Sequence, residues 1–126
     1  MDMAMKLLAI SMVTAIIFIV PIIVYGAFSQ FGLAQIPGNS PGAFLAGVFV
    51  SKIGTAIAFV LLFSLAPAGP ARDWFLYGSI WWIMFAFGEV GQAMGPDYPW
   101  SEALAGMISE AIYFPVSAYL LHRIMG

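Results

Sequence analysis

Three ionisable side chains, Lys52, Glu89 and Glu110, stand inside long apolar stretches of the sequence. An ionised side chain near the centre of a membrane-spanning helix costs at least about 2.5–3.5 kcal/mol on insertion scales, so each of them needs a compensating interaction. One cation and two carboxylates leave a surplus negative charge, so either one carboxyl group holds a proton or water reaches the site. This chemistry predicts a site that binds or conducts a proton, a cation or a small polar solute.

The composition favours lipid as the solvent of this chain. Of its 126 residues, 63% are hydrophobic and 8% are charged, against roughly 45–50% and 25% in soluble domains. The absence of cysteine excludes disulfides, thiol redox chemistry and thiolate metal sites. A net charge of −2 without any basic cluster argues against nucleic acid as a partner.

Four apolar stretches must position the three charges. They predict helices at about 7–28, 42–66, 73–94 and 100–124, because about 20 helical residues cross the apolar core of a bilayer. Gly, Pro and polar residues predict a loop at 29–41, a break at 67–70 and a tight turn at 95–99. The predicted fold class is an all-α integral membrane protein, a single domain over residues 1–126 that forms a four-transmembrane-helix antiparallel bundle.

Two features of these stretches qualify the prediction. A cleaved signal peptide is the rival interpretation of 7–28, but the apolar stretch exceeds the usual 7–15 residues, which favours a spanning helix. Pro21 and Pro115 fall inside predicted helices, where kinks are expected.

The flanking cations predict the orientation. Lys6, Arg72 and Arg123 all lie at one end of the predicted bundle, and the loops 29–41 and 95–99 contain neither Lys nor Arg. Because cytoplasmic loops carry an excess of these residues, both termini are expected in the cytoplasm, in a multi-pass protein of the cell membrane.

Helical geometry predicts that the three charges meet. Counted inward from the outer helix ends, Lys52 and Glu110 lie roughly 15 Å deep and Glu89 roughly 9 Å deep. Residues three, four, seven or eight apart share a helix face, which groups other side chains with them. The predicted ligand- or proton-binding residues are Lys52, Glu89, Gln92 and Glu110, with Trp82, Glu102 and Tyr113 in secondary positions. Beside Lys52, the small residues Gly47, Ser51 and Thr55 predict a ridge that allows close helix approach.

Three other interpretations of the charges remain open. Lys52 could form a structural salt bridge with Glu89 or Glu110. The charges could instead pair across chains, in a homo-oligomer or in an accessory subunit of a larger membrane complex. An intramembrane lipid-modifying enzyme could use Glu89 and Glu110 as acid and base, although no arrangement for nucleophilic catalysis is recognisable and no catalytic residue is assigned.

No cofactor or metal is predicted. The single histidine, His122, excludes a bis-histidine heme within one chain, and the glutamates lack a recognisable metal-ligand spacing. His122 is expected to lie at the membrane interface, near the last carbonyls of its helix.

Chain length and helix number resemble those of the small multidrug resistance transporters. That family carries its coupling glutamate in the first helix, whereas 7–28 holds no ionisable group except Tyr25. No site residue is therefore carried over from this resemblance.

Overall fold

The computed structural model describes residues 2–30, 41–67, 69 and 72–125, and this part of the chain forms four helices and no strand. They are α1 (Met3–Gln30), α2 (Pro41–Leu65), α3 (Trp74–Ala93) and α4 (Trp100–Met125). The all-helical prediction is confirmed. The loop predicted at 29–41 lies mainly outside the described residues, as does part of the break at 67–70.

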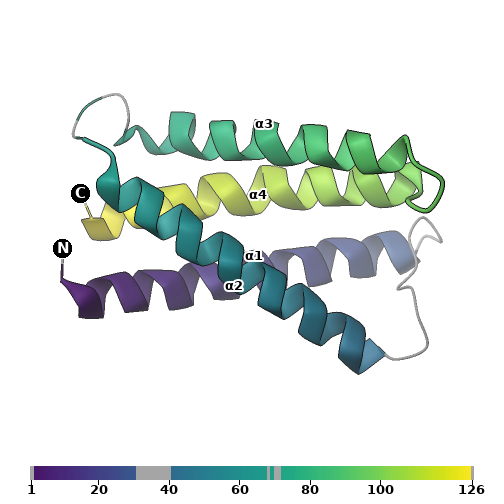
Figure 1. The fold of residues 1–126 in the computed structure, drawn as a ribbon, viewed down its shortest axis with the longest axis horizontal. Coiled ribbons are helices and arrows are strands. Elements are labelled where there is room, and N and C mark those ends of the chain that lie inside the picture. Colours follow the sequence, from purple (N-terminus) through teal and green to yellow (C-terminus); the bar gives the residue numbers. More distant parts are fainter. Residues whose placement is uncertain (1, 31–40, 68, 70–71, 126) are drawn as a thin grey trace.

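Figure 1 shows α3 and α4 side by side along the long axis of the molecule, with both chain termini at the same end. α4 packs against α3 and α1, and α2 packs mainly on α1. In the view of Figure 1, α2 crosses the other helices obliquely. α4 is therefore the helix from which side chains can meet those of every other element.

Local capping residues set the helix ends. α1 begins at Met3, earlier than the predicted residue 7, because Asp2 Oδ1 accepts a hydrogen bond from Met5 N at 2.8 Å. Asp73 caps α3 in the same way, accepting from Leu76 N at 2.9 Å. Such caps satisfy amide donors that have no partner inside the helix. The N-cap at Asp2 is a local signal that the hydrophobic pattern alone did not reveal.

Three of the described helices contain stretches long and apolar enough to cross a membrane: Met3–Ala27, Ala46–Leu65 and Trp100–Met125. α3 has 20 residues, which is a sufficient length. α3 is not among the helices with such a stretch, since Glu89 and Gln92 lie in its last turns and Trp, Tyr and Gly occupy several of its other positions.

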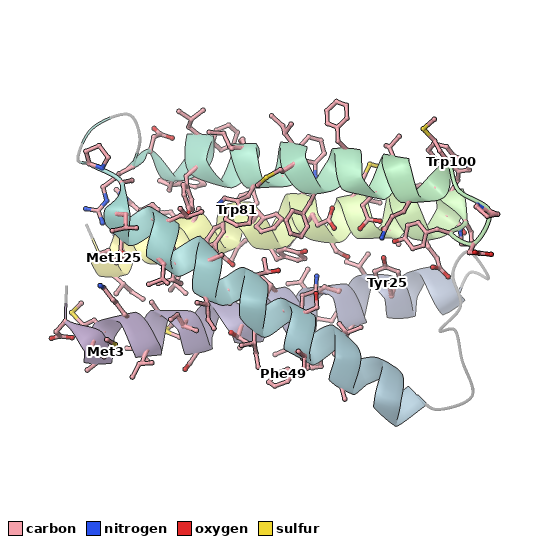
Figure 2. All side chains as sticks on the ribbon, in the orientation of Figure 1. Met3, Tyr25, Phe49, Trp81, Trp100 and Met125 are labelled. Atoms are coloured by element: carbon pink, nitrogen blue, oxygen red, sulfur yellow. The ribbon has the colours of Figure 1, made fainter. Side chains whose placement is uncertain are left out.

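An aromatic cluster joins α2, α3 and α4 on the side of the bundle nearer the termini. The Phe59 ring lies 5.3 Å from Trp81 and 5.6 Å from Phe114, measured between centroids. Tyr77 adds a hydrogen bond from its hydroxyl group to the Phe59 carbonyl oxygen. Trp81, labelled in Figure 2, is only 8% exposed, so its ring packs between helices. Aromatic pairs of this kind contribute about 0.5–1.5 kcal/mol each beyond the area they bury.

Gly78 allows α3 and α4 to approach closely. A Cβ atom at this position would lie 3.1 Å from Pro115 Cα and 3.2 Å from the Phe114 carbonyl oxygen. Small residues at helix contacts have this effect in membrane bundles. Pro115, like Pro21, lies inside a continuous helix.

The small-residue ridge predicted on α2 does not pack within the chain. Gly47 and Ser51 are exposed, and no atom lies within 4 Å of a Cβ built on Gly47. The close helix approach predicted at this ridge is therefore wrong for the described part of the chain. α2 uses a different face for packing, formed by Ala56, Phe59, Val60 and Phe63.

Candidate functional site

Glu110 is a buried carboxyl group in the middle of α4. Its side chain is 4% exposed, and its Oε1 atom has no hydrogen-bond partner among the described residues. The helix places it one turn after Gly106 and three residues before Tyr113, on the buried face of α4. A buried polar oxygen without a partner is costly, and it is far more costly when it carries a charge.

Glu89 of α3 reaches the same place from the opposite side. Its carboxyl group occupies the space beside Gly106, so a Cβ atom at position 106 would overlap it and would lie 2.6 Å from Glu89 Cδ. The carboxyl groups of Glu89 and Glu110 are within hydrogen-bonding reach of each other. We refer to these two groups as the carboxyl pair.

Two tyrosines connect the carboxyl pair to the end of the molecule at the α3–α4 turn. Tyr98, in that turn, donates a hydrogen bond to Glu89 Oε2 at 2.5 Å. The Tyr25 hydroxyl of α1 lies 3.5 Å from the Tyr98 hydroxyl and donates to the Glu102 carbonyl oxygen at 3.2 Å. Burial raises the pKa of the Tyr98 hydroxyl, and its hydrogen bond to Glu89 raises that pKa further. Tyr98 therefore remains a neutral hydrogen-bond donor to Glu89.

Lys52 of α2 lies near the pair but binds a different group. Its ammonium group donates to Tyr113 Oη at 3.0 Å and stands 4.9 Å from the centroid of the Tyr113 ring. It is near enough to interact electrostatically with both Glu110 and Glu89. Within the described residues, Lys52 thus supplies positive charge to the site without a direct hydrogen bond to either carboxylate.

The secondary residues take different positions. Tyr113 is fully buried and is the partner of Lys52. Trp82 donates its indole N–H to the Met107 carbonyl oxygen at 3.0 Å, which links α3 to α4. Glu102 is half-buried in the first turn of α4, and Gln92 is exposed. The structure therefore brings together Lys52, Glu89, Glu110 and Tyr113 and leaves Gln92 outside the group.

Sequence reasoning missed the roles of Tyr98, Tyr25 and Gly106. The two tyrosines lie at or just beyond the ends of apolar stretches of the sequence, a position that aromatic residues often occupy for their own amphipathic character. A usable signal did exist, because a tight turn between antiparallel helices brings residues equidistant from the turn together. Glu89 and Gly106 are nearly equidistant from the 95–99 turn, which points to their contact.

The chemistry that this arrangement supports is acid–base chemistry. The described residues contain no group of three or more His, Cys, Asp or Glu side chains that could hold a metal ion. Two carboxyl groups, three hydroxyl groups and one ammonium group can hold and exchange protons.

Comparisons with protein-family models, curated proteins and solved structures found no match.

Proposed function

We propose that this chain is a multi-pass membrane protein that binds and passes a proton at the carboxyl pair. In this proposal the four helices form an antiparallel bundle across the bilayer, with both termini in the cytoplasm. The observation that carries it is the buried Glu110 carboxyl group, which has an unpartnered oxygen and a second carboxyl group beside it. Two adjacent carboxylates in an apolar environment do not both stay ionised, and sharing one proton relieves their repulsion.

The charge balance supports one bound proton. With a single proton on the carboxyl pair, the remaining negative charge is balanced by Lys52, and the site as a whole is neutral. Neutrality is the state that an apolar environment favours. Lys52 is held by Tyr113 and not by a carboxylate, so the carboxyl pair keeps an oxygen free for the proton.

The tyrosines support a route for the proton. Tyr25 and Tyr98 lead from the end of the molecule at the α3–α4 turn to Glu89, and Glu89 neighbours Glu110. Hydroxyl groups donate and accept hydrogen bonds, so each of them can pass a proton to the next group. A hard metal cation would instead require several oxygen ligands at once.

The test is infrared spectroscopy of the protein in lipid vesicles. We expect the C=O band of a protonated carboxylic acid at neutral pH, lost in Glu110→Gln and shifted in Glu89→Gln. Glu102→Gln is the matched control, because Glu102 is half-buried in α4, the helix of Glu110, and is not a member of the carboxyl pair. Vesicles with the wild-type protein should also dissipate a proton gradient faster than vesicles with Glu110→Gln.

Two results would contradict this function. If both carboxyl groups are ionised at neutral pH, the pair does not hold the proton that the proposal requires. If sodium or potassium changes the carboxylate bands and pH does not, the site binds a metal cation.

A second candidate function, as a subunit of a membrane complex or as a homo-oligomer, is favoured by the exposed ridge at Gly47 and Ser51. Small residues on an open helix face allow another helix to approach closely. Gly47→Leu should then abolish co-purification with a partner in a fixed ratio, or dissociate the oligomer. Gly88→Leu, at an exposed glycine of α3 with open space around it, serves as the control. A monomer that purifies alone would contradict this candidate.

A further inference from the structure

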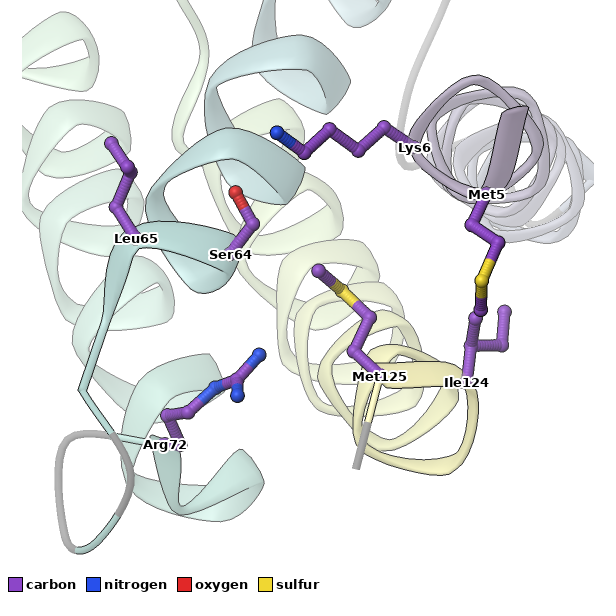
Figure 3. A pocket seen from close by; sticks show the side chains of 7 residues that line it. All are labelled: Met5, Lys6, Ser64, Leu65, Arg72, Ile124 and Met125. Atoms are coloured by element: carbon purple, nitrogen blue, oxygen red, sulfur yellow. The ribbon is translucent and has the colours of Figure 1, made fainter. Parts of the chain in front are cut away.

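A pocket of about 360 Å³ lies at the end of the molecule that holds both termini. Residues of α1, α2 and α4 and the segment before α3 form its walls (Figure 3). It is therefore separated along the bundle from Tyr98 and the α3–α4 turn. We refer to it as the terminal pocket, and it is lined by Met5, Lys6, Ser64, Leu65, Arg72, Ile124 and Met125.

Two cations enter the terminal pocket from different sides. Figure 3 shows Lys6 extending from α1 and Arg72 extending from the segment before α3 toward the space between them. Arg72 Nε is buried and has no hydrogen-bond partner among the described residues. A buried guanidinium N–H without an acceptor is a donor that a bound anion would satisfy.

The position of Arg72 is set by the fold. Its backbone N–H donates to the Gly69 carbonyl oxygen at 3.0 Å, and Gly69 has a φ of +115°, which glycine adopts more readily than other residues. Its guanidinium carbon lies 5.1 Å from the centroid of the Phe63 ring. The turn and the ring together fix the guanidinium group, so an anion would bind to a preorganised donor.

The acidic residues near this end of the helices already have other partners. Asp2 accepts the backbone N–H of Met5, and Asp73 accepts that of Leu76. The Ser64 hydroxyl group donates to the Leu61 carbonyl oxygen. Lys6 and Arg72 are the charged side chains among the residues that line the terminal pocket.

We propose that the terminal pocket binds a phosphoryl group, as presented by the headgroup of an anionic phospholipid. Arginine pairs with phosphate through two parallel N–H donors, and lysine adds a point charge. The apolar walls from Met5, Ile124 and Met125 suit the part of a lipid next to its phosphate. In the orientation proposed above, this pocket lies at the cytoplasmic membrane surface, where anionic lipids concentrate. The cavity and its charges do not depend on the proton site.

The experiment is native mass spectrometry of the full chain, titrated in detergent with phosphatidylglycerol or with zwitterionic phosphatidylcholine. We expect the wild-type protein to retain phosphatidylglycerol in preference to phosphatidylcholine. Lys6→Gln and Arg72→Gln should each weaken this binding about fivefold, which is the usual effect of one basic residue near an anionic lipid surface. Arg123→Gln is the matched control. Arg123 is an exposed cation in the last turn of α4, next to the terminal pocket, and does not line it.

A second titration with inorganic phosphate identifies the source of the phosphoryl group. If phosphate does not displace phosphatidylglycerol, the ligand is the lipid. If phosphate binds alone and competes, and Arg72→Gln weakens it, the site takes a soluble phosphoryl compound. The proposal is wrong if Lys6→Gln and Arg72→Gln behave like Arg123→Gln, or if the wild-type protein binds both lipids equally and no phosphate. Lys6→Gln alone keeps the test valid if Arg72→Gln fails to fold.

Discussion

The carboxyl group of Glu89 rests against the Cα atom of Gly106, in the space that any larger side chain at position 106 would fill. This contact lies one turn before Glu110 on the buried face of α4. In this position Glu89 Oε2 accepts the hydrogen bond from Tyr98. The space at Gly106 is therefore needed for this arrangement of the Glu89 carboxyl group.

Gly106→Ala is expected to displace the Glu89 carboxyl group, which is the far end of a flexible side chain and can move aside, so the free energy of unfolding should fall less than in Gly78→Ala. The infrared band of the carboxyl pair should change as well, because the hydrogen bond from Tyr98 to Glu89 is lost. Thermal unfolding in detergent measures the change in the free energy of unfolding. Gly88→Ala is the control, since no atom lies within 4 Å of a Cβ at position 88. An unchanged infrared band of the carboxyl pair in Gly106→Ala would disprove the contact.

Gly78→Ala is expected to separate α3 from α4 where their backbones are closest. The new methyl group would meet backbone atoms of Phe114 and Pro115, which cannot rotate away as a side chain can. We expect a loss of about 1–3 kcal/mol in the free energy of unfolding. Gly91→Ala, on the same helix with open space around it, should be neutral or slightly stabilising. Equal effects of the two substitutions would rule out the close approach.

Tyr98→Phe removes the hydroxyl group that donates to Glu89. Hydrogen bonds to charged groups contribute about 1.5–3 kcal/mol, so the variant should unfold more easily by an amount in that range. Proton flux into vesicles should also slow, because the route from Tyr25 to the carboxyl pair is interrupted. Tyr119→Phe, which alters an exposed tyrosine of α4, should change neither measurement. Wild-type flux in Tyr98→Phe would exclude Tyr98 from the route.

Tyr113→Phe leaves the Lys52 ammonium group without its hydrogen-bond acceptor in α4. The free energy of unfolding should fall by about 1–3 kcal/mol, the cost of a buried polar group that loses its partner. In the double variant Lys52→Met/Tyr113→Phe, no ammonium group is left unsatisfied, so the combined loss should be smaller than the sum of the single losses. Strict additivity of the two unfolding free energies would show that Lys52 and Tyr113 do not interact.

The sequence alone determined that the described chain is helical and where most of the helices end. Long apolar stretches interrupted by proline, glycine and polar residues leave few other ways to satisfy the backbone. The same stretches singled out Lys52, Glu89 and Glu110, because charges are conspicuous among apolar residues. The early start of α1 depends on the N-cap residue Asp2. An N-cap is a local feature of the sequence, so this helix start could also have been predicted.

Only the tertiary structure decided which side chains become partners. Lys52 shares a layer with two carboxyl groups and yet donates to Tyr113, whereas Gln92 shares a helix face with Glu89 and yet is exposed. Helical periodicity fixes the angle between residues of one helix, but it does not fix how that helix is rotated against its neighbours. That rotation is set by packing at sites such as Gly78, where the backbones of α3 and α4 meet.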